Sequence, residues 1–350
     1  MNNFPKVTVV TVTFNLIKGG RENSFRQCIE SVRNQTYPNI EHLIIDGVST
    51  DGTLNIIKEY AKKGWIRYIS EPDSGHWNAM NKGAKLAEGK YIIYLNSDGF
   101  FAHNNVLEKC IEILEKNGDN CYCVANTAVL SKAGTPLEGL QNLPPAPKEF
   151  FYRAQTYNHE TLICPKKIYE KLGYHNEKYR TAIDYEFNIK LILNGYKQLH
   201  IPEVLTTIRL GGITVTEDFK ATRATIDNVY LLYQDIYPWA KFTKKDIEKL
   251  FSQQILKQSF VKGVKKRIKK LKLQNIDYNI FYADLKNFMW HPVKKYYLFF
   301  FMNFLDISQY RNKKLYKFLK FIPLLKLKET SSSKKIYLFG FIPLLKIKIK

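Results

Sequence analysis

Apolar runs and amphipathic segments alternate along the first part of the chain. Four runs rich in β-branched and aromatic residues predict buried strands: 6–14, 41–45, 66–70 and 91–95. Three segments with apolar residues at steps of three and four predict helices between these strands: 24–35, 53–62 and 78–87. Strands that alternate with helices predict an α/β fold, with a mostly parallel sheet and helices on both of its faces.

The middle of the chain is less regular. Residues 134–148 are rich in proline near their end, which predicts a loop. The segment 150–215 combines a short strand at 161–164 with a helix at 184–194. This segment is too short to form a large domain of its own, and we expect it to complete a site over the edge of the same sheet.

The pattern changes again beyond residue 240. Apolar residues at helical spacing between 255 and 271 alternate with lysine and arginine, which predicts a basic amphipathic helix and a mainly helical C-terminal region. A near-repeat follows, with FIPLLKLK at 321–328 and FIPLLKIK at 341–348. Two copies are too few for a solenoid, and we interpret them as docking elements.

Charge divides the chain at the same place. Of the 54 lysine and arginine residues 27 lie in 241–350, together with only 6 of the 32 aspartate and glutamate residues. The formal net charge of +22 therefore comes almost entirely from this last part, because the preceding residues are close to neutral. We expect a neutral globular body, large enough for a sizeable core, with a basic appendage.

Aromatic residues are interleaved with the lysines of region 241–350. This composition suits an anionic membrane surface, where apolar side chains enter the lipid and basic ones meet the headgroups. It also suits nucleic acid, but no nucleic-acid motif accompanies it, so we predict a membrane surface and no nucleic acid as partner.

Three observations bear on the compartment. No apolar stretch reaches the roughly 18 residues of a spanning helix. No secretory signal is visible, and the five cysteines are scattered and odd in number. We therefore expect buried thiols and a cytoplasmic protein, peripheral on the inner face of the cell membrane.

Polar side chains follow the four predicted strands. Asn15, Asp46, Asp73 and Asp98 each come shortly after a strand end, and in a parallel sheet these ends meet at one edge, where ligands bind. Asp98, close to Asn96, suits a hard divalent cation that neutralises a diphosphate. Taken alone, each of these residues is more often part of a turn or a helix cap.

Four blocks of sequence carry a more specific signal. They are VTVVTVTFN at 7–15, SVRNQTYPNIEHLIIDGVSTDGT at 31–53, SEPDSGHWNAMNKGAKLAEGKYIIYLNSD at 70–98, and HETLICPKKIYEKLG at 159–173 with AIDYEFNIKL at 182–191. In this order and spacing the chain resembles family 2 glycosyltransferases of the GT-A fold, of the bacterial surface-polysaccharide or lipopolysaccharide type, across residues 6–215. The resemblance implies a Rossmann-like sheet, a nucleotide-sugar donor, most commonly a UDP-sugar, and Mg²⁺ or Mn²⁺ as cofactor.

The resemblance also implies roles for individual residues. Asp98 matches the metal-binding aspartate that holds the cation with the diphosphate, and Asp184 matches the general base that deprotonates the acceptor hydroxyl. His159 matches a donor or acceptor contact. A place on the nucleotide side is implied for six residues: Thr13, Asn15, Asp46, Asp73, Asn96 and Ser97.

The reaction that the resemblance implies is a single in-line displacement that inverts the anomeric carbon. Residues 1–125 form the nucleotide-sugar-binding half, 126–240 the acceptor-side half, and 241–350 the membrane-associating region. The QxxRW block of polymerising relatives is absent. This absence favours a non-processive enzyme that adds one hexosyl or N-acetylhexosaminyl unit to a lipid-linked, lipopolysaccharide or capsule acceptor.

The chain departs from the family pattern near the expected metal site. Asn96 and Gly99 stand where aspartates are common, and Asn78 replaces an aspartate before Ala79. A second interpretation therefore stays open. In it the chain is a catalytically impaired binding or scaffold protein of a glycan assembly complex, which keeps the fold without the chemistry.

Overall fold

The computed structural model describes residues 4–142, 158–210, 223–236 and 242–251, together with the strands β10–β15 between 293 and 348. The chain divides into two units, Met1–Ile276 and Asp277–Lys350, which are considered separately below. The predicted basic helix between 255 and 271 lies outside the described residues.

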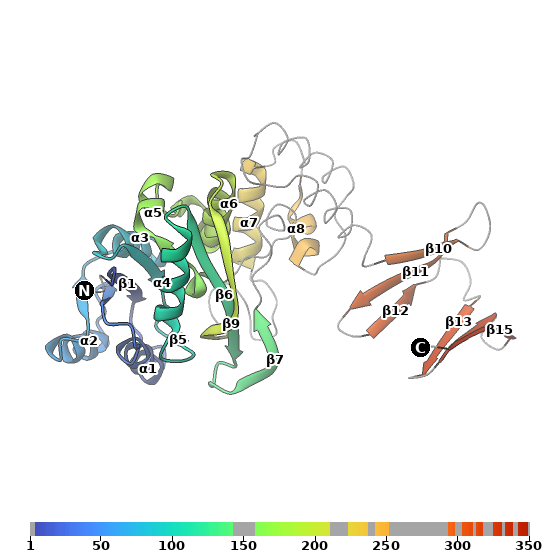
Figure 1. Ribbon diagram of the computed structural model, residues 1–350, viewed down its shortest axis with the longest axis horizontal. Coiled ribbons are helices and arrows are strands. Elements are labelled where there is room, and N and C mark those ends of the chain that lie inside the picture. The colour runs from blue at the N-terminus through green and yellow to red at the C-terminus, as the bar shows by residue number, and fades with distance from the viewer. Residues whose placement is uncertain are drawn as a thin grey trace. The chain divides into compact units, whose positions relative to one another are not determined.

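A mixed sheet organises the first unit (Figure 1). Its strand order is β3-β2-β1-β4-β8-β6-β9-β5, with β7 paired to β6. The strands are β1 Val7–Thr13, β2 Ile40–Asp46, β3 Arg67–Ser70, β4 Tyr91–Tyr94, β5 Phe100–Phe101, β6 Cys121–Leu130, β7 Pro136–Asn142, β8 Ile163–Pro165 and β9 Lys197–Arg209. The helices are α1 Glu22–Arg33, α2 Thr53–Lys62, α3 His76–Leu86, α4 Val106–Asn117, α5 Lys166–Leu172, α6 Ile183–Leu193, α7 Arg223–Ile236 and α8 Lys244–Phe251, with 3₁₀ turns η2 His159–Thr161 and η3 Glu177–Ala182.

The predicted α/β fold is confirmed, and the four predicted strands and three predicted helices all form with ends shifted by a residue or two. β1 pairs in parallel with β2 and β4, and β2 pairs in parallel with β3. Beyond β4 the sheet is mixed, because β8 runs antiparallel to both β4 and β6, and β5 runs antiparallel to β9. Parallel pairing therefore joins the first four strands, and it recurs between β6 and β9.

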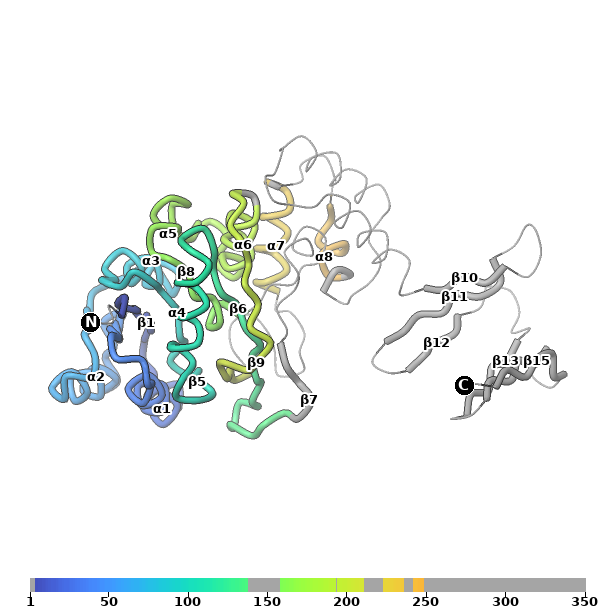
Figure 2. The backbone as a smooth tube through the Cα atoms, in the orientation of Figure 1, coloured from blue at the N-terminus to red at the C-terminus, as the bar shows by residue number. Residues whose placement is uncertain are grey.

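Helices cover both faces of the sheet (Figure 2). On one face α1 and α4 pack on β1, β4 and β6 through a buried cluster that includes Cys28, Val9 and Leu107. On the other face α3 lies close to β1, because Gly83 leaves room for Val10; a Cβ at Gly83 would stand 2.3 Å from Val10 Cγ1. This close packing sets the beginning of α3 at the carboxyl ends of β1 and β2.

Two details of the first unit differ from or refine the sequence prediction. Part of the predicted loop 134–148 is strand β7, which pairs antiparallel with β6 from Leu130 to Thr127. The five cysteines are all free and buried, as predicted, and they lie on α1, α4, β6 and β8. Burial raises the pKa of the Cys28 and Cys110 thiols, which keeps them protonated and unreactive.

The second unit is not helical where it is described, so the expectation of a mainly helical C-terminal region was wrong for these residues. Two antiparallel three-stranded sheets form: β10 Val293–Tyr297, β11 Asn303–Tyr310 and β12 Lys313–Lys317, then β13 Leu325–Thr330, β14 Ser333–Leu338 and β15 Ile342–Lys348. In β13 and β15 leucine or isoleucine alternates with lysine, as LKLK at 325–328 and LKIK at 345–348, and this period of two suits strands rather than helices.

The two copies of the near-repeat supply β13 and β15, which both pair with β14. Residues opposite each other in neighbouring strands share a face of the sheet. In the register of the strands Leu327 lies opposite Ile336, which lies opposite Leu345, and Lys328 lies opposite Lys335, which lies opposite Lys346. Across the helices that the structure describes, we find none with both the length and the hydrophobicity that a membrane span requires.

Candidate active site

Asp46 is the last residue of β2 and lies at the carboxyl edge of the sheet, where β1, β2 and β3 end. Its side chain is fully buried and accepts hydrogen bonds from Thr13 Oγ1 at 3.0 Å and Ser70 Oγ at 2.7 Å. It also accepts from the main-chain N and the Oγ of Ser49, at 3.0 and 2.6 Å. Two residues predicted for the nucleotide side, Thr13 and Asp46, are thus in direct contact, and Asp46 ties three strand ends together.

Two hydrogen bonds of Asn15 connect the loop after β1 with the loop after β2. Its main-chain N donates to Ser49 Oγ and its Oδ1 accepts from the N of Thr50, both at 2.9 Å. The backbone at Asn15 is left-handed, with φ of 46°, a conformation that asparagine tolerates better than most residues. The two loops therefore form one rigid wall of the site.

Asp73 lies against the same wall. Its Oδ1 accepts from the main-chain N of Gly75 at 2.8 Å, just before α3. Its Oδ2 would be only 2.7 Å from a Cβ built at Gly47, so a glycine after Asp46 is needed for this approach. The structure thus brings four of the six predicted nucleotide-side residues to one wall.

The remaining predicted residues lie at the end of β4. Asn96, Ser97 and Asp98 form a turn in which the N of Gly99 donates to the carbonyl of Asn96 at 3.0 Å. Ser97 is buried, whereas the Asp98 side chain keeps 24% of its surface exposed. Arg21 Nη1 lies 3.9 Å from Asp98 Oδ2.

Two arginines therefore surround Asp98, since Arg209 Nη1 donates to its main-chain carbonyl. Arg209 Nη2 is held by Gln27 Oε1 at 2.8 Å, and its guanidinium lies 5.5 Å from the centre of the Phe100 ring. Arg21, at the start of α1, and Arg209, at the end of β9, make this part of the edge positively charged. Such a charge favours a bound diphosphate.

Glu160 packs beneath the Asn96–Asp98 turn and was not predicted from the sequence. Its side chain is 1% exposed, and its Oε1 accepts from Asn96 Nδ2 at 2.8 Å while Oε2 accepts from Asn96 N at 3.3 Å. Burial, opposed by the charge of His159, raises the pKa of Glu160 to about 7. A Cβ at Gly99 would stand 1.9 Å from Glu160 Oε2, so a side chain at 99 and this carboxylate exclude each other.

His159 joins this turn to Asp184. Its Nδ1 lies 3.1 Å from Asp184 Oδ2 and its Nε2 lies 3.3 Å from Asn96 Oδ1. Burial lowers the pKa of His159, but the charge of Asp184 and their hydrogen bond outweigh burial and raise that pKa to about 9. At neutral pH both ring nitrogens are therefore protonated and both donate.

Asp184 lies in the first turn of α6, where the helix dipole favours a carboxylate. Burial raises the pKa of Asp184, but the charge of His159 and its hydrogen bond outweigh burial and lower that pKa to about 2. Asp184 Oδ2 is taken by His159, whereas Oδ1 is buried and has no hydrogen-bond partner within the described part of the chain. A buried oxygen of this kind is costly unless a ligand or water donates to it.

The residues fit a cation that is held jointly with a diphosphate. Among the described residues no three His, Cys, Asp or Glu side chains gather closely enough to hold a metal by themselves. Mg²⁺ bound with a nucleotide needs only one or two carboxylates, because phosphate oxygens and water complete its shell. Asp98, a partly exposed carboxylate at the open edge, meets that requirement.

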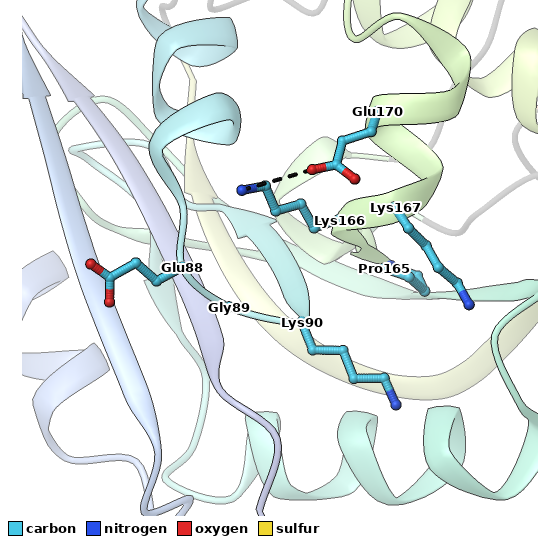
Figure 3. A pocket seen from close by; sticks show the side chains of 7 residues that line it. All are labelled: Glu88, Gly89, Lys90, Pro165, Lys166, Lys167 and Glu170. Atoms are coloured by element: carbon cyan, nitrogen blue, oxygen red, sulfur yellow. Dashed lines mark ion pairs between the residues drawn. The ribbon is translucent and has the colours of Figure 1, made fainter.

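A separate hollow of about 360 Å³ lies at the opposite end of β4 and does not belong to this site (Figure 3). Lys90, Lys166 and Lys167 line it, but each already has a partner. Lys90 Nζ pairs with Glu115 at 2.7 Å, and Lys166 Nζ binds the carbonyl of Ala87 at 2.7 Å. The chemistry therefore centres on the carboxyl edge rather than on the hollow.

Sequence reasoning missed Glu160, Arg21 and Arg209. Glu160 follows His159 directly in the HETL block, and this neighbour was the signal that could have found it. Arg209 had no local signal, because its approach to Asp98 depends on the pairing of β9 with β5 and β6. The predicted residues His159, Asp184 and Asn96 are brought together, although they come from three distant segments.

Carboxylates, arginines and the beginning of α3 lie together at the carboxyl edge of this α/β sheet. Such an arrangement is typical of enzymes that bind nucleotides. The chain belongs to glycosyltransferase family 2: the model described as "Glycosyl transferase family 2" matches residues 8–172. An uncharacterized glycosyltransferase of Methanocaldococcus jannaschii is 31% identical over 212 residues, which are 59% of this chain and 71% of the relative.

Two solved structures share the fold. The structure of Staphylococcus aureus TarS 1–349 in complex with UDP-GlcNAc is 15% identical with a TM-score of 0.53, and the match covers 89% of this chain and 98% of TarS. GalNAc-T7 with UDP, GalNAc and Mn²⁺ is 18% identical, also with a TM-score of 0.53, over 84% of this chain and 60% of GalNAc-T7. The predicted GT-A fold is confirmed.

Proposed function

We propose that this glycosyltransferase is an inverting, non-processive enzyme that moves one sugar from a nucleotide-sugar to a glycan acceptor. One observation carries the proposal: Asp98 and Asp184 come from different segments, and a part-buried hydrogen-bonded connection through His159 joins Asp184 to Asn96, two residues before Asp98. Displacement at an anomeric carbon needs charge neutralisation on the leaving side and a base on the attacking side. Asp98 and Asp184 supply one group for each side.

The leaving side is the turn that carries Asp98. A divalent cation, Mg²⁺ or Mn²⁺, bound by Asp98 together with the diphosphate, supplies charge neutralisation there when present. Support comes from the two structural neighbours, since TarS was solved in complex with UDP-GlcNAc and GalNAc-T7 with UDP, GalNAc and Mn²⁺. Arg21, 44% exposed and beside Asp98, adds a fixed positive charge for the diphosphate oxygens.

The attacking side is Asp184. Its carboxylate takes the proton of the acceptor hydroxyl, while the hydroxyl oxygen forms the new bond to the anomeric carbon. The bond from that carbon to the diphosphate breaks, and its electron pair leaves with the diphosphate. His159, protonated at neutral pH, holds Oδ2 and orients the carboxylate.

The nucleotide side is formed by the wall that Asp46 organises. Thr13, Asn15, Asp46 and Asp73 line the strand ends there, and Ser97 with Asn96 continues the wall to β4. We assign the base and ribose to this wall. Because the Asp46 carboxylate already accepts hydrogen bonds from three side chains and the main chain, its contribution is to hold the wall in shape.

A second candidate, a binding or scaffold protein without turnover, is favoured by Asn96 and Gly99, which leave Asp98 as the single acidic side chain of the turn. Turnover distinguishes the two. Full-length protein is offered a panel of UDP-sugars with Mn²⁺ and glycan acceptors, and nucleoside diphosphate release is measured. We expect release with a matching donor and acceptor; donor binding without release would favour the scaffold.

Asp184→Asn is expected to keep the stabilisation by UDP-sugar, measured by thermal shift, and to lose turnover by about 10²–10⁴-fold. Asp98→Asn is expected to lose the Mn²⁺-dependent part of that stabilisation. Asp119→Asn is the matched control, because Asp119 is an exposed carboxylate whose ion pairs within the described residues are with Lys90 and Lys167. Wild-type turnover in Asp184→Asn would remove this residue from the role of base.

For the acceptor we infer a lipid-linked glycan met at the cytoplasmic face of an anionic membrane, with 1–125 on the donor side and 126–240 on the acceptor side. Support comes from the region 241–350, which carries 27 of the 54 lysine and arginine residues and only 6 of the 32 acidic ones. Full-length protein should sediment with anionic vesicles and not with phosphatidylcholine vesicles. Replacing Lys328, Lys335 and Lys346 by glutamine should weaken sedimentation; equal binding would contradict the membrane role.

A further inference from the structure

Four side chains form one continuous hydrogen-bond chain across the site. Asn96 Nδ2 donates to Glu160 Oε1 at 2.8 Å, His159 Nε2 donates to Asn96 Oδ1 at 3.3 Å, and His159 Nδ1 donates to Asp184 Oδ2 at 3.1 Å. This hydrogen-bond chain begins at Glu160, beneath the turn that carries Asp98, and ends at Asp184, the proposed base. It therefore links the leaving side of the site to the attacking side.

An amide at position 96 makes both hydrogen bonds without any change of protonation. Asn96 donates with its NH₂ group and accepts with its carbonyl oxygen, and a carboxylate cannot do both. An aspartate at 96 would place two carboxylates within hydrogen-bond distance, where one must be protonated or both must move apart. The asparagine that departs from the family pattern is thus the residue that this chain of contacts requires.

Glu160 is fixed at the first place of the chain. It is 1% exposed and packs on Gly99, where any Cβ would stand 1.9 Å from Oε2. Its main-chain N donates to Asn158 Oδ1 at 2.9 Å, which holds the η2 turn. Glu160 cannot turn toward solvent, so its carboxylate sets the orientation of the Asn96 amide.

We propose that Glu160 and Asn96 are positioning residues that act through His159 to hold Asp184 and the Asp98 turn in a single geometry. This inference rests on the proposed function, because it gives both ends of the chain a part in sugar transfer. In reactions of this kind a displacement of about 1 Å costs roughly 10²-fold in rate.

An exchange of carboxylate and amide tests the chain. Asn96→Asp alone should lower kcat by roughly 100-fold, with KM for the donor changed by less than about threefold, because two carboxylates then face each other. Adding Glu160→Gln should bring kcat back to within about tenfold of wild type, since the new amide can donate to the aspartate and His159 still donates to it. Glu160→Gln alone should fall between these two variants.

The matched control is Asn126→Asp. Asn126 is also buried and its Oδ1 also meets a histidine ring, His200 Nε2, at 2.9 Å, but it has no part in the chain. This control should keep wild-type kcat. Wild-type kcat in Asn96→Asp, or a double variant as slow as Asn96→Asp, would overturn the proposal, and thermal unfolding of each variant separates these results from a loss of fold.

A second readout needs no turnover. In ¹⁵N spectra of histidine-labelled protein at pH 7, both ring nitrogens of His159 should be protonated, with slowly exchanging N–H signals assigned by the His159→Gln variant. Asn96→Ala should make the Nε2–H signal exchange fast and leave the Nδ1–H signal in place. If the exchange of the Nε2–H signal is unchanged in Asn96→Ala, the proposed hydrogen-bond chain is overturned. A wild type that shows both slowly exchanging signals but has no transferase activity would reject only the proposed function.

Discussion

Gly99→Ala is a sharp test of how tightly Glu160 is enclosed. The added methyl group would stand 1.9 Å from Glu160 Oε2 and 2.9 Å from its Cδ, whereas ordinary contact begins at 3.4 Å. The carboxylate must therefore move by roughly 1.5 Å, which breaks its hydrogen bonds to the amide and main-chain N of Asn96. Because Glu160 is 1% exposed, water does not replace these partners.

Each hydrogen bond to a charged group contributes about 1.5–3 kcal/mol net. The gain of about 0.4–1 kcal/mol from restricting the unfolded chain offsets part of this loss. We expect a net destabilisation of about 2–5 kcal/mol, which for a unit of this size lowers Tm by roughly 4–15 °C. The measurement is thermal unfolding followed by circular dichroism, with chemical denaturation for the free energy.

The design includes a double-mutant cycle. Gly99→Ala should cost less than about 0.5 kcal/mol in a Glu160→Ala background, because the atoms that clash are then absent. Gly19→Ala is the control, since its added methyl group would have no neighbour closer than 3.4 Å. An unchanged Tm for Gly99→Ala, or the same cost in both backgrounds, would refute the packing described for Glu160.

The remaining predictions concern pH and the Asp46 hub. The raised pKa of His159 means that its pairing with Asp184 stabilises the fold fully below pH 6.5, and this stabilisation of about 3 kcal/mol is lost as pH rises through about 9. Burial lowers the pKa values of His76 and His175 to about 4, so both stay neutral between pH 7 and 10. In the wild type the urea midpoint should fall over this range, and in His159→Gln it should fall less. An equal fall in the two proteins would contradict the role of His159. Asp46→Asn should lower the free energy of unfolding by about 2–3 kcal/mol, because one oxygen that accepts from two donors becomes an NH₂ group; a loss below about 0.5 kcal/mol in urea unfolding would count against the hub.

The parts of the fold that local pattern determines could be predicted from the sequence. β1 to β4 are β-branched runs, and their ends carry Asn15, Asp46 and Asp98 within a few residues, so the carboxyl edge and its polar character follow from periodicity and parallel order. The burial of the cysteines follows from their apolar neighbours in the same way. These features depend on contacts between residues close in sequence.

The parts that depend on distant pairing could not be predicted. Glu160 meets Asn96 across 64 positions because β8 enters the sheet antiparallel between β4 and β6, and nothing near Glu160 encodes that insertion. The helical spacing of apolar residues between 255 and 271 does not continue into 293–348, where the described residues form strands. The alternation in LKLK of β13 and LKIK of β15 has the period of a strand, and both of these strands pair with the intervening β14.

The enclosure of all five thiols gives the first unit an internal set of chemical reporters. Cys28 lies on α1, Cys110 on α4, Cys121 and Cys123 on β6, and Cys164 on β8, and each is at most 1% exposed. A thiol reagent can therefore label a given cysteine only after the element that carries it has opened. Peptide mapping after timed labelling would rank these elements by their opening free energy, and repeating it with a UDP-sugar present would show which elements the donor secures, without introducing a single substitution.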